Sequence, residues 1–174
     1  MTAPLARVTL VLGGARSGKS RYAETLLREA GGGIYLATAQ ALDSEMTARI
    51  ARHRAERGHG WTTVEEPLEL AAALERGAQA GRPILVDCLT LWLSNLMGAG
   101  RATEAETARL RAVLKILPVP VVFVSNEVGL GIVPDNALAR AFRDEAGRLN
   151  QAIAAAADRV VFLAAGLPLV LKGG

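Results

Sequence analysis

The sequence has 174 residues, of which 51% are hydrophobic and 21% are charged, with a formal net charge of +3 and a pI of about 9.5. These values suit one globular domain, which we expect to span residues 1–174, and the net charge is too small to indicate a nucleic-acid partner. The single cysteine excludes an internal disulfide and favours a cytoplasmic location, and no uncharged apolar run reaches the roughly 18 residues that a membrane-spanning helix requires.

The predicted elements alternate between strands and helices along the chain. The first strand, VTLVL, is short and β-branched and is followed by two glycines, as is typical of a buried parallel strand. In chain order we expect a strand at 8–12, a helix at 19–30, a strand at 34–38, a helix from 43 toward 58, a weaker strand at 61–66, a helix at 67–77, a strand at 84–89, helices at 91–97 and 103–117, a strand at 119–127, a long helix capped by Asp135 or Asn136, and strands at 159–166 and 167–171.

Two helices carry more specific predictions. Pro67 is expected in the first turn of its helix, where the missing N–H costs little. The long helix has apolar residues spaced to share one face, namely Leu138, Phe142, Leu149 and Ile153.

The alternation of strands and helices predicts an α/β fold with a mostly parallel sheet covered by helices on both faces.

The motif GGARSGKS, residues 13–20, combines Gly13, four residues and the run Gly18-Lys19-Ser20. It follows a predicted strand and opens a predicted helix, which is the context of a phosphate-binding loop. Glycines let backbone N–H groups converge on phosphate oxygens, and the helix N-terminus adds its positive dipole. We therefore expect Lys19 to reach the β- and γ-phosphates of a nucleoside triphosphate and Ser20 to bind Mg²⁺.

Acidic residues follow two of the predicted strands. Asp87 ends the strand ILVD, where it either holds Mg²⁺ through water or caps the next helix. Glu65 and Glu66 precede Pro67. A carboxylate there matches the N1–H and N2–H donors of guanine, but an acidic residue near a helix start more often compensates the helix dipole.

The stretch NEVGLGIVPDN, residues 126–136, follows a strand and so falls at the sheet edge where ligands bind in open α/β folds. A plain connecting loop fits the same pattern. Trp61 and Trp92 are interpreted as packing or interface residues, and Cys88 as a small core residue.

Both histidines lie in RIARHRAERGHGW, residues 49–61, among four arginines. His53 falls on the apolar face of its predicted helix, which favours a partly buried structural histidine. A neutral imidazole is also a nucleophile toward an α-phosphorus, and Arg54 and Arg57 would stabilise the charge on the phosphoryl oxygens. His59, between two glycines, is interpreted as a loop residue.

In chain order, the segments GGARSGKSRYAE, LATAQALDSEMTARIARHRAERG, WTTVEEP, ILVDCLTLWLSNL and VSNEVGLGIVPDNALARAFRDEAGRLNQAIAAAADRV cover most of the sequence. Together they resemble the bifunctional adenosylcobinamide kinase / adenosylcobinamide-phosphate guanylyltransferase family of cobalamin synthesis. The phosphate loop is generic to many families. The segment HRAER and the run that begins NEVGLGIVP are specific to this one.

The resemblance implies a RecA-like P-loop NTPase fold and two reactions. The first phosphorylates the aminopropanol hydroxyl of adenosylcobinamide with ATP or GTP. The second transfers GMP from GTP to that phosphate through a guanylylated histidine, giving adenosylcobinamide-GDP and pyrophosphate. The family's nucleophile is the histidine followed directly by Arg-x-x-Arg, which is His53 in this sequence.

The resemblance also implies the site residues and partners. Lys19 and His53 are the expected catalytic residues, and Ser20 and Asp87 the expected Mg²⁺ ligands. Family members often have Glu where Asp87 stands, so its contact stays open among Mg²⁺, base and substrate. The implied partners are a corrinoid substrate and further copies of the chain in a homotrimer, with no nucleic acid and no membrane insertion. The implied nucleotide contacts are Gly13, Gly14, Ala15, Arg16, Ser17, Gly18, Lys19, Ser20, Ala37, Thr38, Ala39, Arg54, Ala55, Glu56, Arg57, Glu65 and Asp87.

Two alternatives to this function are considered. A simple P-loop kinase of small molecules would leave His53 as a structural residue. A RecA-like nucleic-acid-binding ATPase fits the fold and the pI, but two Trp, two Tyr and three Phe are too few for a surface on which bases stack.

Overall fold

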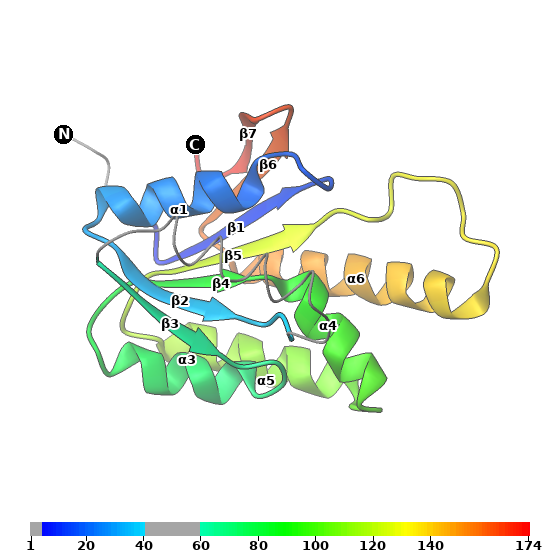
Figure 1. Cartoon of the computed structure of the whole chain (residues 1–174), viewed down its shortest axis with the longest axis horizontal. Helices are drawn as coiled ribbons and strands as arrows, with labels where there is room; N and C mark the ends of the chain where they lie inside the picture. The colour runs from blue at the N-terminus through cyan, green and yellow to red at the C-terminus, as the bar shows by residue number, and fades with distance from the viewer. Residues whose placement is uncertain (1–4, 41–59) are drawn as a thin grey trace.

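The computed structural model of the chain describes residues 5–40 and 60–174, which form a single sheet with helices packed against it (Figure 1). The strands are β1 (Val8–Gly13), β2 (Gly33–Ala37), β3 (Trp61–Glu65), β4 (Ile84–Asp87), β5 (Val121–Asn126), β6 (Arg159–Ala164) and β7 (Leu167–Lys172). The helices are α1 (Lys19–Glu29), α3 (Leu70–Ala78), α4 (Leu89–Gly98), α5 (Thr103–Ile116) and α6 (Ala137–Ala156).

The seven strands lie in the order β3-β2-β4-β5-β1-β6-β7. Every neighbouring pair is parallel except β6 and β7, which form an antiparallel hairpin at one edge. The mostly parallel sheet is therefore confirmed. Because β1 to β6 all run in the same direction, their carboxyl ends meet at one edge of the sheet, and the loops that follow them converge there.

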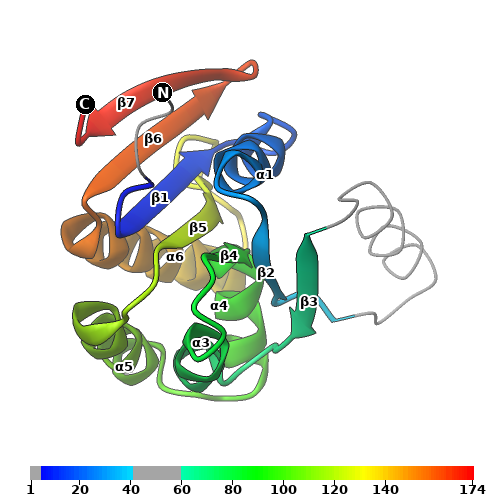
Figure 2. The same cartoon turned by 90° about the vertical axis from the view of Figure 1, so that its left-hand side faces the viewer.

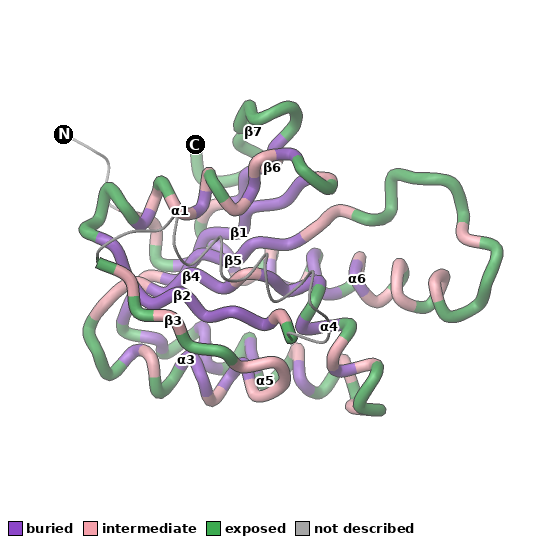
Figure 3. The backbone as a smooth tube through the Cα atoms, viewed as in Figure 1, coloured by how far each residue is buried: buried purple, intermediate pink, exposed green. Residues whose placement is uncertain are grey.

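The central strands β1, β2, β4 and β5 are buried on both faces because their residues alternate between two apolar clusters, whereas the edge strands β3 and β7 are largely exposed. Leu10 of β1 and Phe123 of β5 pack on the face covered by α3, α4, α5 and α6. Val11 and Val122 pack on the opposite face, against Ala23 of α1. Figure 2 shows α1 separated from the other four helices by the sheet, and Figure 3 shows the central strands as the most buried part of the chain. Helices on both faces are thus confirmed.

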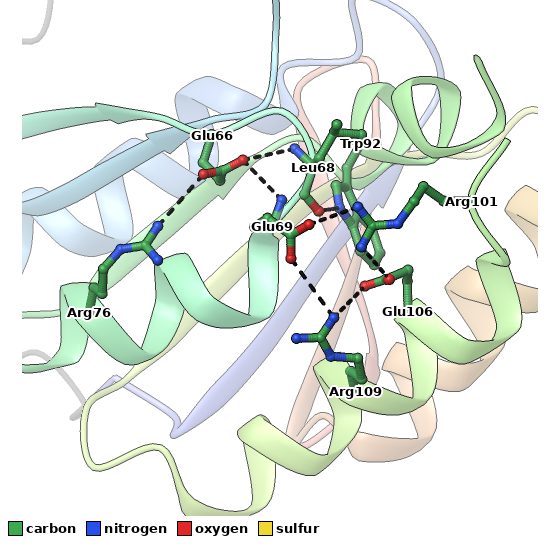
Figure 4. Close-up of polar contacts among 8 residues, drawn as sticks. All are labelled: Glu66, Leu68, Glu69, Arg76, Trp92, Arg101, Glu106 and Arg109. Carbon is green, nitrogen blue, oxygen red and sulfur yellow. Dashed lines mark hydrogen bonds and ion pairs between the residues drawn. The ribbon is translucent and has the colours of Figure 1, made fainter. Parts of the chain in front are cut away.

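The predicted helix start at Pro67 is wrong, because α3 begins at Leu70. The carboxylate of Glu66 accepts hydrogen bonds from the backbone N–H groups of Leu68 (3.0 Å) and Glu69 (2.9 Å). These bonds fold residues 66–69 into a turn before the helix (Figure 4). Pro67 lies within this turn rather than in the helix.

The turn at residues 66–69 is held by contacts from α4 and from Arg101, which lies between α4 and α5. Trp92 of α4 is fully buried and its indole N–H donates to the carbonyl of Leu68 at 2.8 Å. Arg101 donates to Glu69 at 2.7 Å and to Glu106 of α5 at 2.6 Å (Figure 4). The hydrogen bond from Arg101 holds the pKa of Glu69 below its usual value. This network fixes the path of the chain where it leaves β3.

The predicted apolar face of α6 is only partly correct. Leu149 and Ile153 are buried and Phe142 packs against the same core cluster, but Leu138 is 73% exposed. The first turn of α6 extends past the body of the sheet with the loop that precedes it, so this end has no core to pack against (Figure 1). The helix does begin as predicted, because Asn136 caps it by accepting the N–H of Ala139 at 2.7 Å.

Among the described residues, no helix combines the length and apolar character that crossing a membrane requires.

Trp61 contacts the ring of Tyr35 edge to face, with ring centres 6.3 Å apart. Both tryptophans therefore pack inside this chain, as one of the two interpretations expected.

Replacement of Trp92 by Phe should lower the free energy of unfolding by about 1–3 kcal/mol, because it removes the indole hydrogen bond to the carbonyl of Leu68, which then keeps only the N–H of Leu70 as donor, and opens a small cavity. Chemical denaturation measures the change. The same substitution at Trp61, which keeps an aromatic edge against Tyr35, should cost less than about 1 kcal/mol. Equal losses at the two positions would contradict the role given to the indole N–H.

Candidate active site

The loop between β1 and α1 closes tightly over the end of the sheet. Gly13 has a φ of +155°, and a Cβ atom placed on it would lie 2.5 Å from the carbonyl oxygen of Leu163 and 2.6 Å from the hydroxyl of Ser17. Gly18 has a φ of +97°, in the left-handed region that favours glycine. Two glycines of the motif are therefore required by the backbone itself.

The β6–β7 hairpin also supports this loop. Its two-residue turn consists of Ala165 (φ 52°) and Gly166 (φ 79°), the pair of positive φ angles expected of a tight hairpin. The N–H of Gly166 donates to the carbonyl of Ser17 at 3.0 Å. The carboxyl-terminal hairpin thus fixes the phosphate loop from the side opposite to β5.

Lys19 is the first residue of α1 and is only 7% exposed. Its ammonium group donates to the carbonyl of Gly14 at 2.5 Å and lies 3.5 Å from the hydroxyl of Ser17. Burial lowers the pKa of Lys19, while Cys88 and Asp87 act in the opposite direction. A cation removed from water in this way is stabilised by an anion brought to it, so the position suits a phosphate group.

A cavity of about 600 Å³ opens beside Lys19 at the carboxyl edge of the sheet. Residues 15–21 form one wall, which includes the positively charged Arg16 and Arg21. Ala37, Ala39 and Asp87 contribute from the ends of β2 and β4. A volume of this size, at the edge where the loops converge, is typical of a site for a small molecule.

Asp87 does not cap the helix that follows it. The cap of α4 is Cys88, whose sulfur accepts the N–H of Leu91 at 3.4 Å. Asp87 instead accepts the hydroxyl of Tyr35 at 2.9 Å through one carboxylate oxygen, and it lines the cavity. Burial raises the pKa of the Cys88 thiol to about 11, so this thiol stays protonated at neutral pH and serves as the core residue predicted.

Thr38 connects β2 to β4 rather than lining the cavity. Its hydroxyl donates to the carbonyl of Cys88 at 2.7 Å and accepts the N–H of the same residue at 2.9 Å. The side-chain amide of Asn95 donates to the carbonyls of Thr38 (2.8 Å) and Pro67 (3.0 Å). These bonds join the ends of β2, β3 and β4 into one rigid edge, with Thr38 fully buried.

The remaining predicted residues fall into two groups. Glu65 is exposed at the end of β3 and is not part of the cavity wall. His53, Arg54 and the other predicted contacts up to Arg57 lie outside the described residues, as does the predicted helix from 43 toward 58. The structure therefore brings together the phosphate loop, Ala37, Ala39 and Asp87.

Several cavity residues were not predicted from the sequence, among them Tyr35, Val124 and Asn126. The sequence did contain a signal for Tyr35, because alternate residues of a strand lie on the same face of the sheet. Tyr35 shares a face of β2 with Ala37, which was predicted. Asn126 was placed at the sheet edge only as the first residue of a loop, without a role.

Two oxygen-bearing side chains of the cavity are suited to a metal ion. Ser20 and Asp87 line the same cavity and offer the oxygen atoms that Mg²⁺ prefers. The described part of the chain contains no group of three or more His, Cys, Asp or Glu side chains placed to bind a metal. Mg²⁺ is usually held by one or two protein oxygens together with phosphates and water, so the oxygens of Ser20 and Asp87 are of the kind that could hold it.

Comparison with known proteins adds independent information. A sequence profile of the family described as cobinamide kinase / cobinamide phosphate guanyltransferase matches residues 9–171. The chain is 55% identical over 167 residues to the bifunctional adenosylcobalamin biosynthesis protein CobP of Pseudomonas aeruginosa, covering 94% of this chain and 96% of that protein. It is 41% identical over 178 residues to the corresponding protein CobU of Escherichia coli, covering 94% and 98%.

Among solved structures, the flagellar accessory protein FlaH of Methanocaldococcus jannaschii aligns with a TM-score of 0.54 at 14% sequence identity. The alignment covers 97% of this chain and 79% of that one. A likeness at this identity concerns the fold alone. It agrees with the predicted α/β fold, a mostly parallel sheet covered by helices on both faces.

Replacement of Gly13 by Ala should weaken nucleoside triphosphate binding by at least about tenfold, because the added methyl group collides with backbone and displaces the loop. Calorimetric titration with GTP measures the loss. Gly147→Ala in α6, where an added methyl group meets nothing within 4 Å, should bind GTP as the wild type does. Unchanged GTP binding by Gly13→Ala would show that the tight approach to Leu163 is not required.

Proposed function

Because the chain belongs to the cobinamide kinase / cobinamide phosphate guanyltransferase family, we propose that it catalyses both reactions at the cavity beside Lys19. The first transfers a phosphoryl group from ATP or GTP to the aminopropanol hydroxyl of adenosylcobinamide. The second transfers GMP from GTP to the resulting phosphate. The buried ammonium group of Lys19 within the phosphate loop is the observation that carries this proposal.

In the kinase step, the loop holds the β- and γ-phosphates with its backbone N–H groups and Lys19. The substrate hydroxyl attacks the γ-phosphorus, its proton leaves to solvent, and the bond to the β-phosphate oxygen breaks. Little covalent chemistry is required of the protein, so positioning and charge neutralisation provide the catalysis. Ser20 and Asp87 are proposed to hold Mg²⁺, which would neutralise charge on the phosphates.

In the transfer step, a ring nitrogen of His53 attacks the α-phosphorus of GTP. A phosphorus–nitrogen bond forms, the bond to pyrophosphate breaks, and pyrophosphate leaves. An oxygen of the corrinoid phosphate then attacks the same phosphorus and releases the imidazole. The resemblance supplies His53. The described residues add that Ala39, just before the stretch that holds His53, lies in the cavity wall.

The proposal extends to the base and to assembly. Glu65 is proposed to accept the guanine N1–H and N2–H donors, and Arg54 to Arg57 to contact the phosphates, as the resemblance implies. We also propose a cytoplasmic homotrimer. Exposed apolar side chains of the kind that subunit interfaces bury support self-association, including Leu130, Ile132 and Leu167.

Replacement of His53 by Ala should abolish covalent labelling of the protein by α-³²P GTP and leave phosphorylation of the corrinoid, because the kinase step uses the substrate hydroxyl as nucleophile. Gel autoradiography measures the label, which should be lost in acid and stable in base. His59→Ala is the matched control and should label normally. A His53→Ala protein that still labels would remove His53 from this role, whereas a wild-type protein that does not label would indicate a simple kinase.

Replacement of Lys19 by Ala should reduce both reactions by at least about a hundredfold, because one cation serves both. The melting temperature should not fall, since burial of the ammonium group disfavours its charge in the free protein. Lys115→Ala, on the exposed side of α5, is the control and should keep both activities. Wild-type rates in Lys19→Ala would refute the assignment of the loop.

A further inference from the structure

Asn126, the last residue of β5, places a side-chain amide in the cavity wall. Val124 and Asn126 both line the cavity, whereas the hydroxyl of Ser125 between them donates to Asn150 of α6 at 2.7 Å on the other face of the sheet. Within residues 5–40 and 60–174, the side-chain amide of Asn126 has no hydrogen-bonding partner. The donors of this amide are therefore available to a ligand in the cavity.

The backbone of Asn126 is fixed from the opposite face of the sheet. Its N–H donates to the hydroxyl of Thr90 at 2.7 Å, and its carbonyl accepts from the amide of Asn150 at 3.2 Å. The hydroxyl of Ser125 lies 3.4 Å from that of Thr90, which closes the network. Thr90, Ser125 and Asn150 are all buried. A buried polar network with satisfied partners fixes geometry strongly, so Asn126 is held in one position.

The sheet order places this amide beside the phosphate loop. Strand β5 lies between β4, which carries Asp87, and β1, which leads into the loop. Asn126 pairs in register with Gly13, and the N–H of Glu127 donates to the carbonyl of Gly13 at 3.0 Å. Asp87 pairs with Val124, so Asn126 reaches farther along the edge than Asp87.

We propose that the side-chain amide of Asn126 donates a hydrogen bond to the terminal phosphoryl group of the bound triphosphate. This inference rests on the proposed function. In the kinase step that group is the one transferred, and a neutral donor fixed beside it stabilises its oxygens without exchanging a proton. In the transfer step the same group belongs to the departing pyrophosphate. Thr90, Ser125 and Asn150 are positioning residues, since they act through the backbone of Asn126.

Nucleotide binding alone tests this contact. Affinities for GDP and for the non-hydrolysable analogue guanosine 5′-(β,γ-imido)triphosphate are measured by calorimetry on Asn126→Ala and Asn126→Asp. The Ala variant should lose about tenfold in affinity for the analogue and less than about twofold for GDP, because only the analogue has the terminal group. The Asp variant keeps the shape of the side chain and should lose more, because a carboxylate repels phosphate.

Gln79→Glu is the matched control, since it makes the same change from amide to carboxylate at an exposed residue at the carboxyl end of α3. It should bind both nucleotides as the wild type does. Equal losses for GDP and the analogue in both Asn126 variants would overturn the proposal, as would unchanged affinity for the analogue. The Asp variant keeps the test valid if the Ala variant folds poorly.

The positioning role has its own test. Thr90→Val removes the acceptor of the Asn126 N–H while keeping the shape of the side chain, and Thr90→Ser restores a hydroxyl. The preference for the analogue over GDP should fall several-fold in Thr90→Val and return in Thr90→Ser. If Thr90→Val kept the wild-type preference for the analogue over GDP, the positioning role of Thr90 would be overturned.

Kinetics separate this inference from the proposed function. In Asn126→Ala, kcat of corrinoid phosphorylation should fall more than the rate of labelling by α-³²P GTP, because the terminal group is transferred only in the kinase step. An equal fall in both rates would overturn the preferential role in the kinase step. A wild-type protein inactive in both reactions would contradict the proposed function, while the nucleotide affinities would still decide the Asn126 contact.

Discussion

Lys19 stands at the first position of α1 with its ammonium group removed from water and held by the carbonyl of Gly14 and the hydroxyl of Ser17. Neither oxygen carries a full charge, so the free protein keeps a cation under conditions that disfavour it. A phosphate group reverses this balance, because it brings negative charge to a position of low dielectric constant. The buried cation therefore favours the binding of an anion beside it.

The parallel sheet gives that cation its surroundings. Because β1, β4 and β5 end at the same edge, the loop, Asp87 and Asn126 come together without long-range adjustment of the chain. The β6–β7 hairpin supports the loop, and the Thr38–Cys88 and Asn95 bonds fix the ends of β2, β3 and β4. One rigid phosphate site can then serve two reactions, which differ in the phosphorus that is attacked.

The sequence predicted the parts of this site that depend on local pattern. The phosphate loop was recognised because its glycines and its lysine have fixed spacing, and the buried strands because they are continuous apolar runs. The turn at Glu66 was missed because its side chain competes with the helix for backbone donors, which spacing does not reveal. The exposure of Leu138 and the position of the Asn126 amide depend on tertiary packing, so periodicity alone did not give them.

The titration of Lys19 is the measurement closest to the central claim. Nuclear magnetic resonance of lysine-labelled protein follows its side chain. In the free protein the pKa of Lys19 should lie below the ordinary value of a lysine, and binding of GTP should raise it, because phosphate favours the charged form. A Lys19 whose pKa has the ordinary value, and does not change when GTP binds, would contradict the site described for this cation.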